Sequence, residues 1–478
     1  MLVFVISLLA VFGFVFAFIF LGIAPMLRDA INETHTGISA IFDDNLTEEE
    51  KETAVKSAGL ALLKKSFEIL WRIALSLVAA AAPVYLSDKL GYVPAETVTQ
   101  LMLRWEFIIG TTATLGGIGW IISKYQKKYK PQSAYSVPDK IIHKLAFSST
   151  SIQLTAAEIE DSLFANLIGK IEDQPPIFIT SLPRTGTTIL LTVLNEIPNT
   201  ASHIYRDMPF IMSPLLWSRI NRMSGKRSEM KERAHGDGIK IGYDSPEAFE
   251  EIIWRTFWPQ KYHKKSIELW CIEDILPEAT EYFIKHFRKI VALRTNGTGC
   301  YISKNNNNIA RLEILPEMFP NSHIVVPLRE PAEQATSLFR QHKNFLKQQS
   351  ADPFIECYMR DIGHLEFGKL HTPFAFASFD RMASSPEKTD YWLDYWIAAY
   401  EMVLERAGRL HIVSLEKLGK HPKIVLDRLC ERLNLDPSEV NLSKNIRPIE
   451  NKAESGLFEA RKLAIATDIY HNLLKYQV

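Results

Sequence analysis

The amino-terminal stretch of the chain is continuously apolar. Residues 1–27 contain no charged side chain, and most positions are Leu, Val, Ile, Phe or Ala. A helix of about 20 apolar residues is long enough to span a bilayer. No basic segment precedes the run and no small-residue cleavage site follows it, so the pattern predicts a retained transmembrane helix rather than a cleaved signal peptide.

Two later apolar segments are weaker candidates for membrane spans. Residues 67–87 contain Arg72 near one end, from where a long side chain can reach the membrane interface. Residues 107–123 are uncharged but short for a span. The alternative is that this pair forms amphipathic core helices of a small hairpin. We therefore expect one to three transmembrane helices within residues 1–125 and a juxtamembrane linker over residues 126–150.

The distribution of basic residues predicts the topology of these spans. Lys and Arg are frequent in residues 28–65 and 124–130, whereas residues 88–106 contain only Lys89 and Arg104. Basic residues concentrate in cytoplasmic loops. An integral membrane protein with its large carboxyl-terminal domain in the cytoplasm is therefore expected, whether one or three segments span.

From about residue 151 onward, short apolar runs alternate with helical patterns, which predicts an α/β domain over residues 151–478. Two runs, residues 176–180 and 321–328, are typical of buried strands that each lead into a helix. The expected fold is a P-loop-like parallel sheet flanked by helices. The stretch of residues 391–400 spaces its aromatic side chains along one helix face, which is more typical of core packing than of a base-binding platform. A further strand and helix are expected over residues 410–418 and 422–433.

The turn after the first strand, residues 181–188, reads Ser-Leu-Pro-Arg-Thr-Gly-Thr-Thr. Backbone N–H groups at the start of a helix favour a bound anion. A nucleotide-triphosphate loop reads G-x-x-x-x-G-K-[ST], but here Ser181 replaces the first glycine and Thr187 replaces the lysine. The positive charge comes instead from Arg184, whose planar fork can hold two oxygens of a phosphate or sulfate. The alternative is an ordinary turn with a surface arginine. The candidate anion ligands are Arg184, Thr185, Gly186, Thr187 and Thr188.

This loop resembles the 5′-phosphosulfate loop of sulfotransferases that use 3′-phosphoadenosine 5′-phosphosulfate (PAPS), which typically reads P-R-S-G-T-T. The donor also carries a 3′-phosphate, so the resemblance implies a second anion site. Arg329 ends the predicted strand 321–328, and Ser337 follows it at the interval of the family's 3′-phosphate motif. Without the first loop, an arginine at a strand end would be interpreted as a solvated surface residue.

The resemblance to the branch that includes tyrosylprotein and many bacterial sulfotransferases also implies catalytic residues. Lys304 occupies the place of a lysine that opens a helix ahead of the 3′-phosphate arginine and would stabilise the leaving group. The asparagine run of residues 305–308 departs from the family's Ser-Pro or Asp-Pro, and Lys304 is alternatively a polar loop residue. The family's glutamate base corresponds most closely to Asp207, with His203 as second choice. Alternatively, Asp207 pairs with Arg206 or belongs to a turn.

Residues 242–251 predict the start of a helix, with Ser245 as its cap and Pro246 in its first turn. Just before or within this segment, three polar side chains are candidates for an acceptor pocket. They are His235, Asp237 and Asp244.

Several function classes are disfavoured. No H-E-x-x-H or paired C-x-x-C spacing predicts a metal site, and the four dispersed cysteines are typical of free thiols in a reducing compartment. The balance of 55 basic and 55 acidic residues gives no reason to propose nucleic acid. The resemblance implies sulfuryl transfer from PAPS, without a metal, to a hydroxyl or amine acceptor. The predicted membrane anchor suggests that this acceptor is lipid- or glycan-linked and lies near membrane lipid. The rivals are a P-loop nucleotide kinase or NTPase, disfavoured by the missing lysine, and a catalytically inactive nucleotide-fold membrane scaffold.

Overall fold

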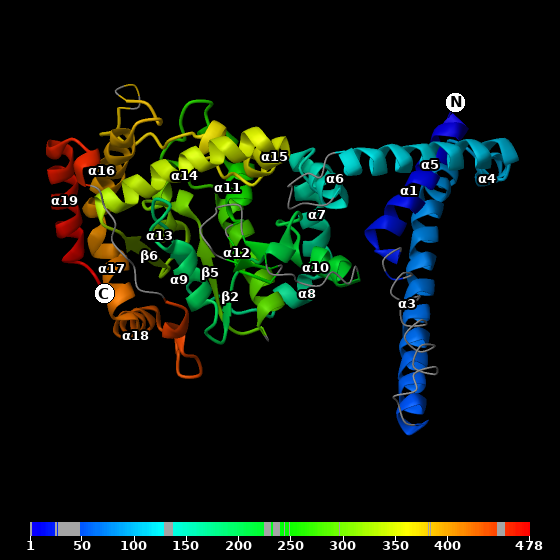
Figure 1. The fold of residues 1–478 in the computed structure, drawn as a ribbon, viewed down its shortest axis with the longest axis horizontal. Coiled ribbons are helices and arrows are strands. Elements are labelled where there is room, and N and C mark those ends of the chain that lie inside the picture. Colours follow the sequence, from blue (N-terminus) through cyan, green and yellow to red (C-terminus); the bar gives the residue numbers. More distant parts are fainter. Residues whose placement is uncertain are drawn as a thin grey trace. The chain divides into compact units, whose positions relative to one another are not determined.

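The computed structural model describes residues 2–23, 26, 48–128, 137–223, 231–232, 240–242, 244–247, 249–295, 297–380, 382, 384–446 and 455–478. The chain divides into two compact units (Figure 1). One unit comprises Met1–Pro138 and Ile220–Lys226, and the other comprises Asp139–Arg219 and Arg227–Val478.

The first unit is helical. Its helices are α1 (Leu2–Phe20), α3 (Glu48–Lys89), α4 (Ala95–Met102) and α5 (Trp105–Lys128). Helix α1 packs along α3, and the approach is close at Gly13, where an added Cβ would lie 2.8 Å from the carbonyl oxygen of Ala79. Small residues permit this kind of contact between membrane helices.

Two helical segments among the described residues, Leu2–Phe20 and Leu62–Lys89, are long and apolar enough to cross a membrane. Only 22% and 17% of their apolar windows are buried within the structure, which is unlike the core helix of a soluble protein. The predicted span at residues 67–87 lies in the second of these segments. The predicted span at residues 107–123 lies in α5, which is not one of the two candidate spans among the described residues. Residues 129–136 of the predicted linker lie outside the described residues.

The second unit is built on a five-stranded parallel sheet with the order β2-β5-β1-β6-β7. The strands are β1 (Ile177–Ile179), β2 (Thr200–Ala201), β5 (Cys300–Lys304), β6 (His323–Leu328) and β7 (His411–Ser414). Strand β1 is central, because Ile179 pairs with Lys304 on one side and with Val325 on the other. The predicted parallel α/β fold is confirmed.

Apolar side chains cover both faces of the sheet, as expected for a parallel sheet. Alternate residues point to opposite faces, so Ile177 and Ile179 belong to one apolar cluster and Phe178 to the other. The first face packs against α9 (Thr187–Leu194), α17 (Leu415–Lys420) and α18 (Pro422–Leu433). The second packs against α11 (Glu251–Phe257), α12 (Pro277–Arg294), α14 (Pro331–Ala351), α16 (Thr389–Glu405) and α19 (Ala460–Leu474).

The aromatic stripe predicted for residues 391–400 lies on α16 and is core. Trp392, Trp396 and Tyr400 are each at most 1% exposed. The predicted helix at the carboxyl side of β7 is also present as α18, which ends at Asn434 in the left-handed conformation. Figure 1 shows α16 beside α14 and α19 at the orange and red end of this unit.

Shorter elements complete the second unit. They are α6 (Val137–Ala146), α7 (Thr150–Leu163), α8 (Ala165–Ile168), α10 (Pro214–Met223), α13 (Leu315–Met318), α15 (Pro353–Asp361), β3 (Lys231–Glu232) and β4 (Lys240–Ile241). Three 3₁₀ segments bear on the site. They are η1 (Tyr205–Asp207), η4 (Asn306–Arg311) and η5 (Gly368–Leu370).

A buried ion cluster between α7 and α12 makes the stability of this unit depend on pH. Lys289 lies 3.2 Å from Glu160 and 2.5 Å from Asp161. Burial raises the pKa of Glu160 to about 7, although Lys289 acts in the opposite direction. At this side chain the folded protein therefore binds a proton more tightly than the unfolded chain does, so the contribution of Glu160 to stability is greatest below pH 4.5 and falls as the pH rises to about 7.

We expect the Glu160→Gln variant to lose this contribution, because its side chain cannot ionise. The contribution amounts to about 3 kcal/mol across that interval. Urea unfolding at several pH values checks it. An equal pH slope in the variant and in the unmodified protein would show that Glu160 is not its source.

Candidate active site

Three neighbouring strands deliver the predicted site residues to one edge of the sheet. Lys304 is the last residue of β5, the loop 180–186 follows β1, and Arg329 follows β6. Because β5, β1 and β6 are adjacent and parallel, their carboxyl ends meet. Ligand sites of open α/β sheets form at this edge.

The backbone of the β1 loop adopts a shape that requires left-handed residues. Gly186 caps α9 with φ 81°, and an added Cβ would lie 2.6 Å from Leu415 Cδ1, so glycine is needed there. Arg184 has φ 76°, which is uncommon for a residue with a side chain. Helix α14 holds this shape, because Gln334 donates to the carbonyl oxygens of Leu182 and Pro183 at 3.2 and 3.0 Å.

The two predicted anion sites are joined. The Nε of Arg184 donates to the hydroxyl of Ser337 at 3.2 Å, and a guanidinium nitrogen of Arg329 donates to the carbonyl oxygen of Arg184 at 3.2 Å. Arg329 also pairs with Glu333 at 3.1 Å. The structure thus brings Arg184 to Arg329 and Ser337, which lie 145 and 153 positions later in the sequence.

The three threonines of the loop have different surroundings. Thr185 is fully buried, and its hydroxyl donates to the carbonyl oxygen of Leu182 at 3.1 Å, so it closes the loop internally. Thr187 donates to the side-chain oxygen of Asn306 at 3.2 Å. Thr187 and Thr188 line a cavity with Arg184, whereas Thr185 does not.

This cavity is lined by both polar and apolar residues. The cationic and hydroxyl- or amide-bearing ones are Arg184, Thr187, Thr188, Lys304 and Asn306. Helices α14 and α15 and the loop after α15 contribute Phe345, Met359, His364, Glu366 and Phe367. Cationic and apolar residues in one cavity suit an anionic group and a partly apolar second molecule.

Lys304 is 5% exposed, and its ammonium lies 3.3 Å from Glu247. The other carboxylate oxygen of Glu247 accepts a hydrogen bond of 2.5 Å from Tyr205. The ammonium therefore has a fixed direction at the end of β5. The predicted helix after Lys304 is a 3₁₀ segment, η4, that begins at Asn306.

The predicted helix start at Ser245 is wrong. The hydroxyl of Ser245 accepts a hydrogen bond of 3.0 Å from the backbone of Gly242, which makes a turn instead of a helix cap. Pro246 then pairs with Ile204 in an antiparallel bridge, and α11 begins only at Glu251. This extended pairing is what carries Glu247 to Lys304.

Among the proposed acceptor-pocket residues, Asp244 pairs with Arg206 at 2.8 Å on the surface. His235 and Asp237 lie outside the described residues. The predicted alternative pairing of Arg206 with Asp207 is not observed, because Asp207 pairs with Arg294.

Asp207 and His203 form a buried cluster that does not line the cavity. Asp207 accepts from Arg294, from His203 Nδ1 at 3.2 Å and from the backbone N–H of Ile204 at 3.0 Å. Burial by itself would raise the pKa of Asp207, but Arg294 and His203 outweigh it and lower that pKa. The second ring nitrogen of His203 contacts His286 at 2.9 Å. Both side chains thus bind protein groups.

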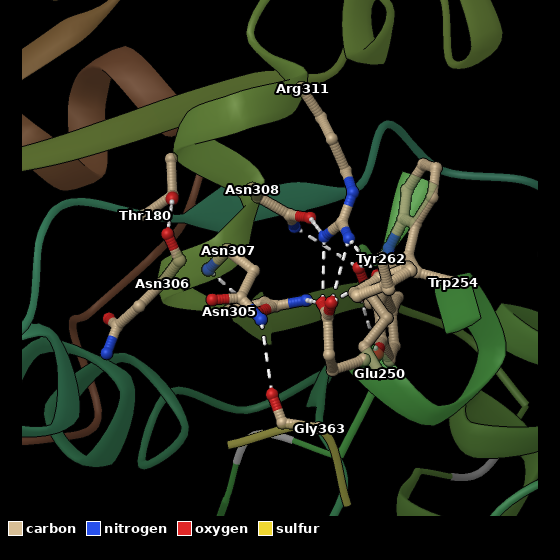
Figure 2. Close-up of polar contacts among 12 residues, drawn as sticks. Thr180, Glu250, Trp254, Tyr262, Asn305, Asn306, Asn307, Asn308, Arg311 and Gly363 are labelled. Atoms are coloured by element: carbon tan, nitrogen blue, oxygen red, sulfur yellow. Dashed lines mark hydrogen bonds and ion pairs between the residues drawn. The ribbon is translucent and has the colours of Figure 1, made fainter. Parts of the chain in front are cut away.

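The asparagine run of residues 305–308 is a buried junction (Figure 2). Asn305 donates to Glu251 at 2.8 Å, and Asn308 donates to Glu250 at 3.2 Å. Asn307 donates to the carbonyl oxygen of Gly363 at 3.4 Å. The run therefore ties the segment after Lys304 to α11 and to the loop after α15.

Arg311 anchors this junction and was not anticipated from the sequence. Its guanidinium binds both carboxylate oxygens of Glu251 at 2.9 Å and also Asn308 at 2.9 Å. It lies between the rings of Trp254 and Trp270, at 4.3 and 4.2 Å from their centroids. An arginine at the end of a polar run carries no sequence signal for such complete burial.

Comparison with known proteins assigns most of the second unit to one protein family. The family model described as the sulfotransferase family matches residues 175–439. The sequence matches no curated protein.

Three solved structures of bacterial sulfotransferases are similar to the chain. STF1 from Mycobacterium tuberculosis H37Rv is 10% identical, with 73% of this chain and 89% of that one covered and a TM-score of 0.39. STF9 from Mycobacterium avium is 13% identical, with coverages of 66% and 80% and a TM-score of 0.37. A sulfotransferase from Alicyclobacillus acidocaldarius is 13% identical, with coverages of 64% and 98% and a TM-score of 0.34.

Proposed function

Because the chain belongs to the sulfotransferase family, we propose that it transfers a sulfuryl group from PAPS to a hydroxyl or amine acceptor. The observation that carries the proposal is the contact between Arg184 of the β1 loop and Ser337 of α14. A donor with a phosphosulfate and a separate phosphate needs two anion sites a short distance apart. Arg329 contributes the second guanidinium beside that contact.

The residues proposed to bind PAPS form two groups, one for each of its anionic ends. Arg184, the backbone N–H of Gly186, and the hydroxyls of Thr187 and Thr188 would bind the 5′-phosphosulfate at the amino end of α9. Thr185 supports the loop from within. Arg329 and Ser337 would bind the 3′-phosphate.

Lys304 is proposed to stabilise the leaving group. The acceptor oxygen attacks sulfur as the bond from sulfur to the bridging oxygen breaks, and negative charge develops on the departing adenosine 3′,5′-bisphosphate (PAP). A positioned ammonium lowers the energy of that charge. Lys304 lines the cavity and its ammonium is held by Glu247, which supports this role. The base predicted from the sequence, Asp207 or His203, stays a prediction, and their contacts favour a positioning role.

The rival functions make different demands on the loop. A metal-dependent kinase or NTPase needs the lysine that Thr187 replaces, and here Thr187 is hydrogen-bonded to Asn306. An inactive scaffold needs no open cavity that joins the loop to Lys304. The cavity therefore favours transfer.

We further propose that α1 and α3 hold the protein in a membrane with the catalytic domain in the cytoplasm. Many large apolar side chains of both helices are exposed, which is costly in water but favourable in lipid. Examples are Phe4, Leu9 and Phe12 of α1, and Phe67, Leu70 and Trp71 of α3. This location suggests a lipid- or glycan-linked acceptor.

Replacing Lys304 by alanine is expected to lower kcat by about 10²–10³-fold, because one donor to the developing charge is lost. The measurement is transfer of labelled sulfate from PAPS to a membrane extract, with PAP binding as evidence of a folded site. Lys423→Ala is the matched control, since Lys423 forms an exposed pair with Asp427 on α18. Unchanged kcat in Lys304→Ala would remove this residue from the mechanism.

A further inference from the structure

Glu366 is an unused acidic group at the candidate cavity. Glu366 is one of the residues that line the cavity with Arg184 and Lys304. Its carbonyl oxygen is hydrogen-bonded to His371, but no hydrogen bond or ion pair joins its carboxylate to another residue within the described part of the chain. A carboxylate left without a partner in a polar cavity is available to a ligand.

The other acidic side chains near the site are engaged. Glu247 binds Lys304 and Tyr205. Asp207 binds Arg294, His203 and the backbone N–H of Ile204, as described above. Neither Asp207 nor Glu247 lines the cavity. Of these three acidic residues, Glu366 alone lines the cavity with Arg184 and Lys304, so it is the one placed to meet a bound acceptor.

The loop that carries Glu366 is held at both ends. Gly363 has φ +80° and packs against Glu251, where an added Cβ would lie 2.6 Å from Cγ. Gly368 has φ +72°, and an added Cβ would lie 2.3 Å from the side-chain oxygen of Gln349. Asn307 also donates to the carbonyl oxygen of Gly363, which links the loop to the strand end at Lys304 (Figure 2).

His371 fixes the backbone of Glu366 itself. Burial, reinforced by His342, lowers the pKa of His371 to about 3, so the imidazole is neutral. A carbonyl oxygen can only accept, so Nδ1 of His371 carries the proton and donates to Glu366 at 2.6 Å. The other ring nitrogen then accepts from the hydroxyl of Tyr391 at 2.7 Å. A held backbone restricts where the carboxylate can point.

The cavity lining also includes apolar residues. They are Phe345, Met359 and Phe367. A molecule bound there would place an apolar framework on these three side chains and a polar group between Glu366 and Lys304. This arrangement fits an alcohol or phenol better than a highly charged acceptor.

We propose that Glu366 is the general base of the transfer and that the acceptor is a hydroxyl on an apolar framework packed against Phe345, Met359 and Phe367. This inference rests on the proposed sulfuryl transfer from PAPS. The acceptor oxygen forms a bond to sulfur, its proton passes to the Glu366 carboxylate, and the bond from sulfur to the bridging oxygen breaks. PAP leaves with the electron pair of that bond.

The test uses the full chain in detergent, labelled PAPS and a membrane extract as the acceptor probe. Glu366→Gln is expected to lower kcat by at least about 10²-fold, the ordinary contribution of general base catalysis. PAP binding should stay unchanged, because Glu366 does not contact the proposed phosphate ligands. Glu366→Asp keeps a proton acceptor and should recover part of the lost rate. Glu356→Gln is the control, since Glu356 lies on α15 and pairs with Arg360 and Lys369 outside the cavity.

The pH profile separates a base from a structural residue. The charged or titratable residues that line the cavity with Glu366 are Arg184, Lys304 and His364, and Tyr395 of α16 interacts electrostatically with Glu366. The unmodified protein and the Glu366→Gln variant share these groups and differ only in the carboxylate. Without that carboxylate, the variant should need hydroxide from the solvent to remove the acceptor proton. The residual rate of Glu366→Gln should therefore rise by about tenfold per pH unit while that of the unmodified protein levels off.

Three outcomes overturn the inference in distinguishable ways. If Glu366→Gln transfers as fast as the unmodified protein, Glu366 is not the base and the proposed function stands. If Glu366→Gln loses PAP binding as well as activity, the residue is structural. If the unmodified protein transfers no label, the proposed function itself fails.

Discussion

Replacing Arg184 by alanine is expected to lower kcat/KM for PAPS by about a thousandfold. Two charge-assisted hydrogen bonds to the donor are lost, at about 2 kcal/mol each. The contact between Arg184 and Ser337 means that the proposed 3′-phosphate site is disturbed as well. Initial rates over a range of PAPS concentrations, together with the Kd for PAP, measure the effect.

One further variant separates the charge of Arg184 from its shape, and another serves as a control. Arg184→Lys keeps the charge but loses the planar fork, so an intermediate rate is expected. Arg288→Ala removes an arginine of α12 whose partner Asp173 is exposed, and this variant should behave like the unmodified protein. Equal rates for Arg184→Ala and Arg288→Ala would contradict the proposed role of the loop.

Replacing Arg311 by leucine is expected to destabilise the protein by about 3–5 kcal/mol, because Glu251 is left buried without its cation. Glu251 is only 2% exposed and Arg311 is fully buried. Domain stabilities are commonly about 5–15 kcal/mol, so a substantial fraction of the stability would be lost. Urea unfolding gives the change directly. The transfer rate should fall too, since the same network holds the segment after Lys304.

The double variant Arg311→Leu, Glu251→Leu tests whether buried charge is the cause. It should be more stable than Arg311→Leu, because no uncompensated charge remains. Full recovery is not expected, since Asn305 and Tyr262 also bind Glu251. A double variant no more stable than the single one would show that lost packing against Trp254 and Trp270 matters instead.

The strands and helices around both anion motifs could be predicted from the sequence, because each motif lies within one short stretch of the chain. In each, a buried strand leads within a few residues into a helix start, so strand, loop and helix are encoded in one short stretch. The strands β1 and β6 and the helices α9 and α14 are present as predicted. The aromatic stripe on α16 was predicted as core for the same reason, since its periodicity lies within one helix.

The acidic residues near the cavity did not follow from the sequence, because long-range pairing brings them there. Glu247 reaches Lys304 through a bridge between residues 204 and 246, in a segment whose Ser-Pro pattern predicts a helix. Glu366 lies in an irregular loop with no periodicity and no motif. A side chain of this kind becomes a candidate only when the cavity that it lines is known.

The proposed function requires the β1 loop and the Arg329–Ser337 pair to bind a nucleotide with separate 5′ and 3′ anions and without a metal. Thermal unfolding of the full chain with PAP, in the absence of Mg²⁺, is the decisive measurement. At a hundredfold excess over Kd, a gain in stability of about 2.7 kcal/mol is expected. No gain with PAP, or a gain with Mg-ATP alone, would contradict it.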